Sequence, residues 1–84
     1  MPQRVIFSVE ARADLRAIDR ETALRLLKAL ARFLATDTGN VKQLEGFDPP
    51  RYRLRISDWR IIFRKTGGDA IEILRVRNRR EAYR

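Results

Sequence analysis

Residues 51–65 read RYRLRISDWRIIFRK, and this stretch decides the fold. From Arg51 to Ile56, basic residues at odd positions alternate with apolar residues at even positions. Because successive side chains of a strand point to opposite faces, this alternation predicts a strand with one apolar and one cationic face. Ser57 and Asp58 are typical turn residues, and the alternation resumes after them. The stretch therefore predicts a β-hairpin that holds several guanidinium groups on one surface.

The residues before the hairpin predict two helices with almost no loop between them. Ser8 is a suitable N-cap for a first helix that ends near Ile18, and Asp19 can cap a second helix that ends near residue 36. An apolar stripe at helical spacing runs along the second helix through Ala23, Leu24, Leu27, Leu30, Ala31 and Leu34, with Leu26 and Phe33 on one flank. The stripe suits packing against a sheet; a dimerisation seam is the alternative.

The segments at either end complete the predicted architecture. Residues 4–7 form a short β-like run, residues 66–69 are a strong turn signal, and residues 70–77 form a further strand. The middle of this last strand has apolar residues at both odd and even positions, so both of its faces are apolar. This predicts a central position in the sheet. We expect one α+β domain over residues 1–84, in the order β-α-α-β-β-β. Its αα-hairpin would cover one face of a twisted antiparallel sheet, and the other face would carry the arginines.

The composition excludes several classes of site. The chain of 84 residues has no cysteine and no histidine, so neither a disulfide nor a thiolate or imidazole metal site can form. No metal and no cofactor is therefore expected. No apolar run approaches the roughly 20 residues needed to span a bilayer, and the N-terminus does not resemble a secretory signal. These features predict a soluble, cytoplasmic protein without a membrane partner.

The positive charge is concentrated in the C-terminal part of the chain. The net charge is +8, and residues 51–84 carry eleven basic and four acidic side chains, against eight and seven in residues 1–50. Most of the basic residues are arginine, which favours bidentate contact with phosphate or carboxylate. A merely solvated basic face is the alternative, but the asymmetry between the two parts favours an anionic partner.

The predicted helix-free face brings arginines of several strands together. Arg53 and Arg55 come from one strand and Arg60 from its hairpin partner, and Arg75 or Arg77 of the last strand can join them. Neighbouring strands are about 4.8 Å apart, so these side chains can converge on one or two phosphates. Such a face suits single-stranded RNA better than duplex DNA, for which no recognition helix is evident.

Aromatic residues next to the arginines have two interpretations. Tyr52 and Trp59 could stack on bases, but their parity favours a place in the core. Tyr83 lies in the basic tail, where neighbouring arginines favour its phenolate, and it could move a proton. Metal-free RNA cleavage needs such a group, because the ribose 2′-OH must lose a proton as it attacks the phosphate. The alternative for Tyr83 is packing on the edge of the sheet.

Several motifs in order resemble the RelE/ParE toxin superfamily over almost the whole chain. They are the opening segment 7–15, Leu44-x-Gly46, the hairpin core 52–63 and the tail 76–83. The resemblance implies a toxin of a type II toxin–antitoxin pair with an αα-hairpin on an antiparallel sheet. It also implies a cognate antitoxin as partner, with contact to DNA only through the antitoxin complex.

The RelE branch of this superfamily cuts mRNA in the ribosomal A site, with the 2′-OH as nucleophile. Carried across by motif, the resemblance assigns catalytic roles to Arg60, Arg79 and Tyr83. It also places Arg53 and Arg55 where that branch has basic residues, and these two, with Arg77 and Arg80, are the expected contacts to RNA phosphate. The implied partners are mRNA on the ribosome and 16S rRNA.

The chain departs from the RelE pattern at one informative position. Many relatives have a histidine where this chain has Asn78, which cannot exchange protons, so proton transfer would depend on Tyr83. The ParE branch shares the fold, lacks the nuclease residues and poisons DNA gyrase. Retention of Arg60, Arg79 and Tyr83 favours RNA cleavage over gyrase inhibition. An RNA-binding module without catalysis is the third possibility.

Overall fold

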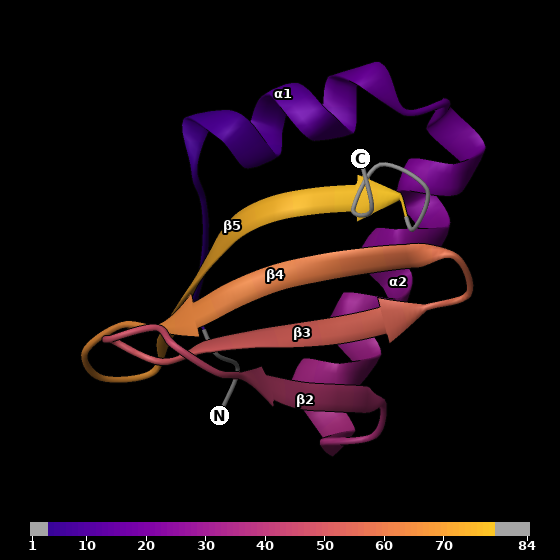
Figure 1. Ribbon diagram of the computed structural model, residues 1–84. Helices are drawn as coiled ribbons and strands as arrows, with labels where there is room; N and C mark the ends of the chain where they lie inside the picture. The colour runs from indigo at the N-terminus through magenta and orange to yellow at the C-terminus, as the bar shows by residue number, and fades with distance from the viewer. Residues whose placement is uncertain (1–3, 79–84) are drawn as a thin grey trace.

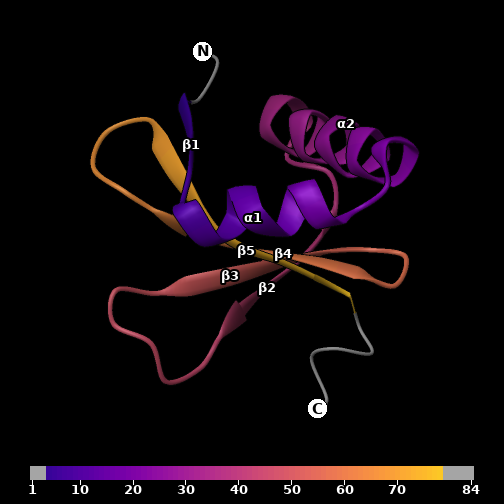
Figure 2. The ribbon, with the colours of Figure 1, turned by 90° about the horizontal axis from the view of Figure 1, so that it is seen from above.

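The computed structural model describes residues 4–78, which form a five-stranded sheet with two helices on one of its faces (Figure 1). The strands and helices are β1 (Arg4–Phe7), α1 (Val9–Ala17), α2 (Arg20–Thr36), β2 (Asn40–Leu44), β3 (Arg51–Ile56), β4 (Trp59–Lys65) and β5 (Ala70–Asn78). Seen from above, both helices lie on the same side of the strands, which leaves the other face of the sheet without a helix (Figure 2). The predicted α+β class, with an αα-hairpin on one face, is confirmed.

The sheet differs from the prediction in two respects. The strand order is β1-β5-β4-β3-β2, and β1 pairs in parallel with β5 whereas the other pairs are antiparallel. The sheet is therefore mixed rather than antiparallel throughout. Strand β2 was also not predicted, because only two of its five residues are apolar and the alternation is too short to indicate a strand. Pairing with β3 along its whole length makes it a strand. The predicted central position of β5 is confirmed, since it lies between β1 and β4.

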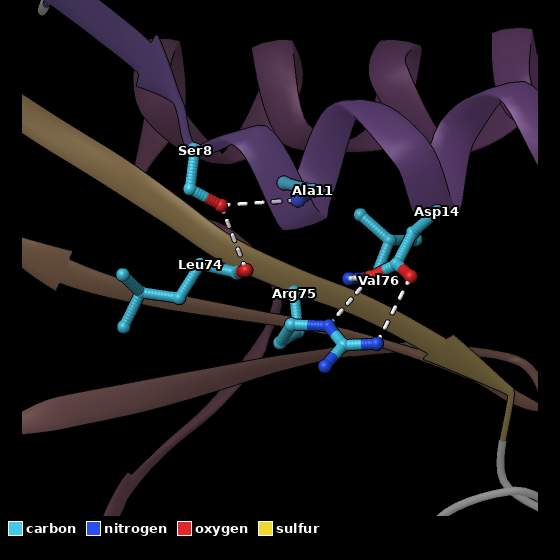
Figure 3. Close-up of polar contacts among 6 residues, drawn as sticks. All are labelled: Ser8, Ala11, Asp14, Leu74, Arg75 and Val76. Carbon is cyan, nitrogen blue, oxygen red and sulfur yellow. Dashed lines mark hydrogen bonds and ion pairs between the residues drawn. The ribbon is translucent and has the colours of Figure 1, made fainter.

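Both predicted helix caps are present, and the first one also ties its helix to the sheet. The Oγ of Ser8 accepts a hydrogen bond from the backbone N–H of Ala11 at 3.0 Å and donates one to the carbonyl of Leu74 at 2.9 Å (Figure 3). Asp19 caps α2 by accepting from the N–H of Thr22 at 2.9 Å, and this hydrogen bond lowers the pKa of Asp19. Each cap satisfies a backbone donor that has no partner within the helix.

The C-terminal end of α2 requires a glycine close to the sheet. The helix ends at Asp37 in the left-handed conformation, and Gly39 follows with a φ of 153°. A Cβ at Gly39 would lie 2.9 Å from Cδ1 of Leu54, which is closer than side-chain packing allows. The C-cap is Asp37, and Gly39 lets the chain pass closely over β3 as it enters β2.

The hydrophobic core lies between the helices and the covered face of the sheet. Its buried residues are Ala11, Leu26, Leu30, Leu54, Ile61, Phe63, Ile71, Ile73 and Val76. The predicted stripe on α2 is shifted around the helix: Leu26, expected on a flank, is fully buried, whereas Leu24 is 47% exposed. The apolar positions of α2 cover a wide arc, and only the docking of the αα-hairpin on the sheet selects which part of that arc is buried.

Asp14 joins α1 to an irregularity in β5. The register shifts between Ile62 and Phe63, so that Leu74 has no partner in the pairing with β4, as in a β-bulge. Oδ2 of Asp14 accepts from Nε of Arg75 at 2.9 Å and from the N–H of Val76 at 2.8 Å, and Oδ1 accepts from Nη2 of Arg75 at 3.1 Å (Figure 3). The carboxylate therefore satisfies a backbone donor at the bulge and holds the adjacent guanidinium.

The environment of Asp14 predicts acid-sensitive stability. Burial raises its pKa, but the hydrogen bonds from Arg75 and Val76 outweigh that effect, and the pKa is lowered from 3.8. A carboxylate with a lowered pKa in the folded state stabilises the fold above its unfolded pKa, and this contribution disappears as the pH falls through the folded value. Thermal unfolding of Asp14→Asn should show a lower Tm than wild type at pH 7, with a smaller difference at pH 3.

The matched control for this prediction is Glu45→Gln, which removes an exposed carboxylate from the β2–β3 loop. Its Tm should follow that of wild type at every pH. Part of the acid sensitivity should persist in Asp14→Asn, because the pKa of Asp19 is also lowered. Parallel pH profiles for wild type and Asp14→Asn would contradict the assigned role of the carboxylate.

Candidate functional site

Three arginines form a row across the helix-free face of the sheet. Arg55 of β3 is the partner of Arg60 of β4, and Arg60 is the partner of Arg77 of β5. Side chains of directly opposite residues share a face, and their Cβ atoms are about 4.5–5.5 Å apart. The register thus collects one guanidinium from each of three neighbouring strands into one rung.

A second rung lies two residues further from the β3–β4 turn. It pairs Lys42 of β2 with Arg53, and Arg53 with Ile62 of β4. The Nε of Arg53 is buried without a hydrogen-bond partner in the described structure. A buried donor without a partner costs free energy, and a bound anion would offset that cost. We call Lys42, Arg53, Arg55, Arg60 and Arg77 the cationic face.

The third rung of this face contains an acidic side chain. Arg51, Arg64 and Glu72 are successive partners across β3, β4 and β5. Nη2 of Arg64 lies 2.7 Å from Oε1 of Glu72, and Nε of Arg64 donates to the same oxygen at 2.8 Å. An acid is thus built into this rung, whereas the first two rungs contain none.

The cationic face carries an electrostatic cost in the folded protein. Like charges directly opposite each other in a sheet destabilise it, and the first rung places three in succession. These side chains are partly withdrawn from water, since Arg53, Arg60 and Arg77 are only half-exposed. Both effects raise the local positive potential, and the negative charge of a bound polyanion would offset it. The arrangement can hold a phosphodiester and neutralise charge that develops on it.

The structure separates the two candidates from β5. Arg77 joins the first rung through its register with Arg60. Arg75, the other candidate, is the partner of Ile62, and Asp14 of α1 holds its guanidinium. The bulge at Leu74 changes the parity of both arginines relative to Ile71 and Ile73, and no sequence pattern indicated that change.

The two hairpin aromatics belong to the core. The ring of Tyr52 stacks on that of Phe63 with centroids 5.5 Å apart, and Trp59 packs against the buried cluster. The interpretation of these residues as base-stacking surfaces was therefore wrong, and the core alternative is confirmed. Lys42 was not predicted as a residue of this face. The polar–apolar–polar order of Asn40, Val41 and Lys42 is only a weak signal of a strand. Arg79, Arg80 and Tyr83 lie outside the described residues 4–78.

An open groove lies beside the cationic face, between α2 and β3. It has a volume of about 960 Å³. Its rim carries Arg25, Lys28 and Arg32 from α2 and Arg55 from β3, and its apolar lining includes Leu54 and Ile56. Arg55 therefore borders both surfaces. Such a groove suits an acidic amphipathic segment of another protein.

Two other kinds of site find no support in residues 4–78. Acidic side chains do not gather there in a group that could hold a metal ion. Among the helices of that range, none is long and apolar enough to cross a membrane.

Structural comparison finds the same fold in toxins solved with their antitoxins. The archaeal RelE–RelB complex from Pyrococcus horikoshii contains a chain with a TM-score of 0.73 and 25% identity, covering 94% of this chain and 97% of that chain. The RelB–RelE antitoxin–toxin complex from Methanococcus jannaschii gives 0.74 and 21%, with coverage of 93% and 94%. The toxin–antitoxin complex RelBE2 from Mycobacterium tuberculosis gives 0.69 and 23%, with coverage of 94% and 100%.

Sequence comparison assigns the family. No curated protein matches the chain at the sequence level. The family model described as "ParE toxin of type II toxin-antitoxin system, parDE" matches residues 5–83, which is nearly the whole sequence. The motifs that resembled the superfamily and the fold that the described residues adopt agree with this match. The chain therefore belongs to the ParE toxin family of type II toxin–antitoxin systems, within the RelE/ParE superfamily.

Proposed function

We propose that this toxin is a ribosome-dependent mRNA interferase, a metal-independent endoribonuclease that acts in the cytoplasm. The observation that carries the proposal is the first rung, where Arg55, Arg60 and Arg77 are aligned across three strands. A single scissile phosphate fits such a row, and arginine is the side chain best suited to bidentate phosphate contact. The substrate is mRNA in the ribosomal A site, with 16S rRNA as a further contact.

The proposed reaction uses a nucleophile that the substrate itself provides. The ribose 2′-oxygen attacks the adjacent phosphorus, and the bond from phosphorus to the 5′-oxygen of the next nucleotide breaks. The products are a 2′,3′-cyclic phosphate and a free 5′-hydroxyl. Arg60, with Arg79, stabilises the additional negative charge on the phosphorane, while Arg53, Arg55, Arg77 and Arg80 hold the flanking backbone.

Proton transfer is assigned to Tyr83, since the chain has no histidine and arginine does not act as a base. The proton must leave the 2′-hydroxyl, and another must reach the departing 5′-oxygen. Tyr83 follows Asn78, the last residue of β5, by five positions, a reach of up to about 17 Å. The end of β5 is next to Arg77 of the first rung, so this reach is sufficient for the phenol to meet a phosphate bound there.

Tyr83→Phe tests the proton-transfer assignment. The substitution removes one oxygen, so mRNA cleavage should fall by about 100- to 10,000-fold, the usual contribution of general acid–base catalysis. Affinity for a single-stranded RNA oligonucleotide should not change, because the cationic face is intact. Cleavage can be measured as truncated products on ribosomes programmed with a defined mRNA. Unchanged cleavage by Tyr83→Phe would assign the residue to packing and favour another proton acceptor.

The overall proposal is tested by primer extension on translated mRNA after the toxin is induced. New 5′ ends within codons are expected at early times, and they should be absent when translation is blocked before induction. If growth stops without new 5′ ends, the nuclease function is wrong.

Inhibition of DNA gyrase is the second candidate, and the ParE family match favours it. Under this alternative the purified toxin would block supercoiling of relaxed plasmid by gyrase, and translated mRNA would stay intact. The supercoiling assay and primer extension on the same preparation therefore separate the two functions.

We also infer that the toxin binds a cognate antitoxin, since the three similar structures are toxin–antitoxin complexes. The groove between α2 and β3 supports this partner, because its rim is basic and its lining is partly apolar. An acidic amphipathic segment would complement both properties. Through Arg55, such a segment would also cover one end of the first rung, and contact with DNA would arise only through the antitoxin.

A further inference from the structure

Phe47 is an exposed aromatic side chain beside the cationic face. It lies in the loop between β2 and β3 and is 43% exposed. The guanidinium carbon of Arg51 lies 4.5 Å from the centroid of its ring. Arg51, Arg53 and Arg55 are alternate residues of β3, so the side chain of Arg51 leaves the strand on the helix-free face. The Phe47 ring therefore lies at the end of the helix-free face that is farther from the β3–β4 turn.

The exposure of Phe47 distinguishes it from the other aromatic residues in the described range. Those residues are part of the core or pack against it: Phe7, Phe33, Tyr52, Trp59 and Phe63. Single-strand-binding proteins stack bases on aromatic rings that lie in a basic groove, with cation–π contributions from arginine. The ring offers a π-surface, and the neighbouring basic residues track the backbone.

The spacing along β3 suits one continuous strand of RNA. Arg51 precedes Arg55 by four residues, and a strand rises about 3.3 Å per residue, so their Cα atoms are about 13 Å apart. That separation corresponds to a few nucleotides of extended RNA. We propose that Phe47, held by Arg51, stacks on a base of the RNA strand whose phosphates bind the cationic face. This inference rests on the proposed RNA substrate.

The surroundings of Phe47 favour a prearranged ring. Pro49 and Pro50 restrict the backbone just before β3, which limits the conformations of this short loop. The third rung supplies charge balance nearby, because Arg64, the partner of Arg51, is neutralised by Glu72. The third rung therefore contains an acidic side chain, which suits an uncharged base better than a phosphate at this end.

Binding measurements with two probes of equal charge test the proposal. The first probe is a single-stranded ten-nucleotide oligoadenylate, and the second has the same backbone with abasic positions. Phe47→Ala should weaken binding of oligoadenylate by about tenfold, within the range observed for loss of one stacked base. Binding of the abasic probe and the salt dependence of both affinities should not change, because no phosphate contact is removed.

Two further variants separate stacking from simple packing. Phe47→Leu keeps an apolar side chain without a π-surface and should behave like Phe47→Ala. Phe47→Trp should restore the affinity, and its added fluorescence should be quenched by oligoadenylate but not by the abasic probe. Thermal unfolding checks that all three variants remain folded.

The outcomes distinguish this inference from the proposed function. Equal loss of affinity for both probes in Phe47→Ala would overturn stacking, because the ring would then only support Arg51. Full affinity in Phe47→Leu would overturn it too, and so would failure of wild type to bind oligoadenylate, whereas the nuclease proposal is decided by primer extension on translated mRNA. If wild type binds in a Phe47-dependent manner but cleaves nothing, base stacking holds and the nuclease function is wrong.

Discussion

Arg60→Ala is expected to abolish toxicity while the protein remains folded. Arg60 occupies the middle of the first rung, between Arg55 and Arg77, so a phosphate held by the row is closest to this residue. Loss of one positioned donor to a charged transition state lowers the rate by about 100- to 1,000-fold. Cleavage of translated mRNA by purified toxin should fall by that factor, and cells that express the variant should grow.

The fold of Arg60→Ala should be retained because the substitution also removes like-charge repulsion from the rung. The Tm should therefore stay within a few degrees of wild type. Arg60→Lys keeps the charge but loses the bidentate geometry, and should recover only part of the activity. Arg12→Ala, on the exposed surface of α1, is the matched control and should remain fully toxic. Toxicity of Arg60→Ala at the wild-type dose would refute the proposed role of the rung.

Phe63→Ala is expected to have the largest effect on stability. Phe63 is 1% exposed, and its ring lies 5.5 Å from that of Tyr52 and 5.9 Å from that of Phe33. It thus connects α2 with β3 and β4 at the centre of the core. Truncation of a buried phenylalanine costs about 3–5 kcal/mol, and in a domain of this size each kcal/mol lowers the Tm by about 4–8 °C.

The measurement is urea or thermal unfolding followed by circular dichroism. Phe63→Leu should fall between wild type and alanine, since it leaves a smaller cavity. Leu24→Ala provides the control, because Leu24 is 47% exposed and its loss should change stability by only about 0.5 kcal/mol. If Leu24→Ala were as destabilising as Phe63→Ala, the orientation of α2 on the sheet would be wrong.

The sequence by itself determined the elements whose signal is local. The alternation in residues 51–56 and the turn after it specified the β3–β4 hairpin, because period-two patterning needs only neighbouring side chains. Ser8 and Asp19 marked the starts of both helices through hydrogen bonds that span three residues. Within the hairpin, the same alternation predicted that Arg53, Arg55 and Arg60 share a face.

Only the tertiary structure decided the features that depend on partners far apart in the chain. Pairing with β3 makes β2 a strand, and docking on the sheet selects Leu26 over Leu24 for burial. The bulge in β5 places Arg75 and Arg77 on the opposite parity from Ile71 and Ile73, and Asp14, 61 residues away, holds Arg75. Local patterns carry no information about such choices, since each one is made by a register or a hydrogen bond between distant segments. The pattern of residues 51–65 thus supplied the charges, and the register across β3, β4 and β5 decided which of them form one site.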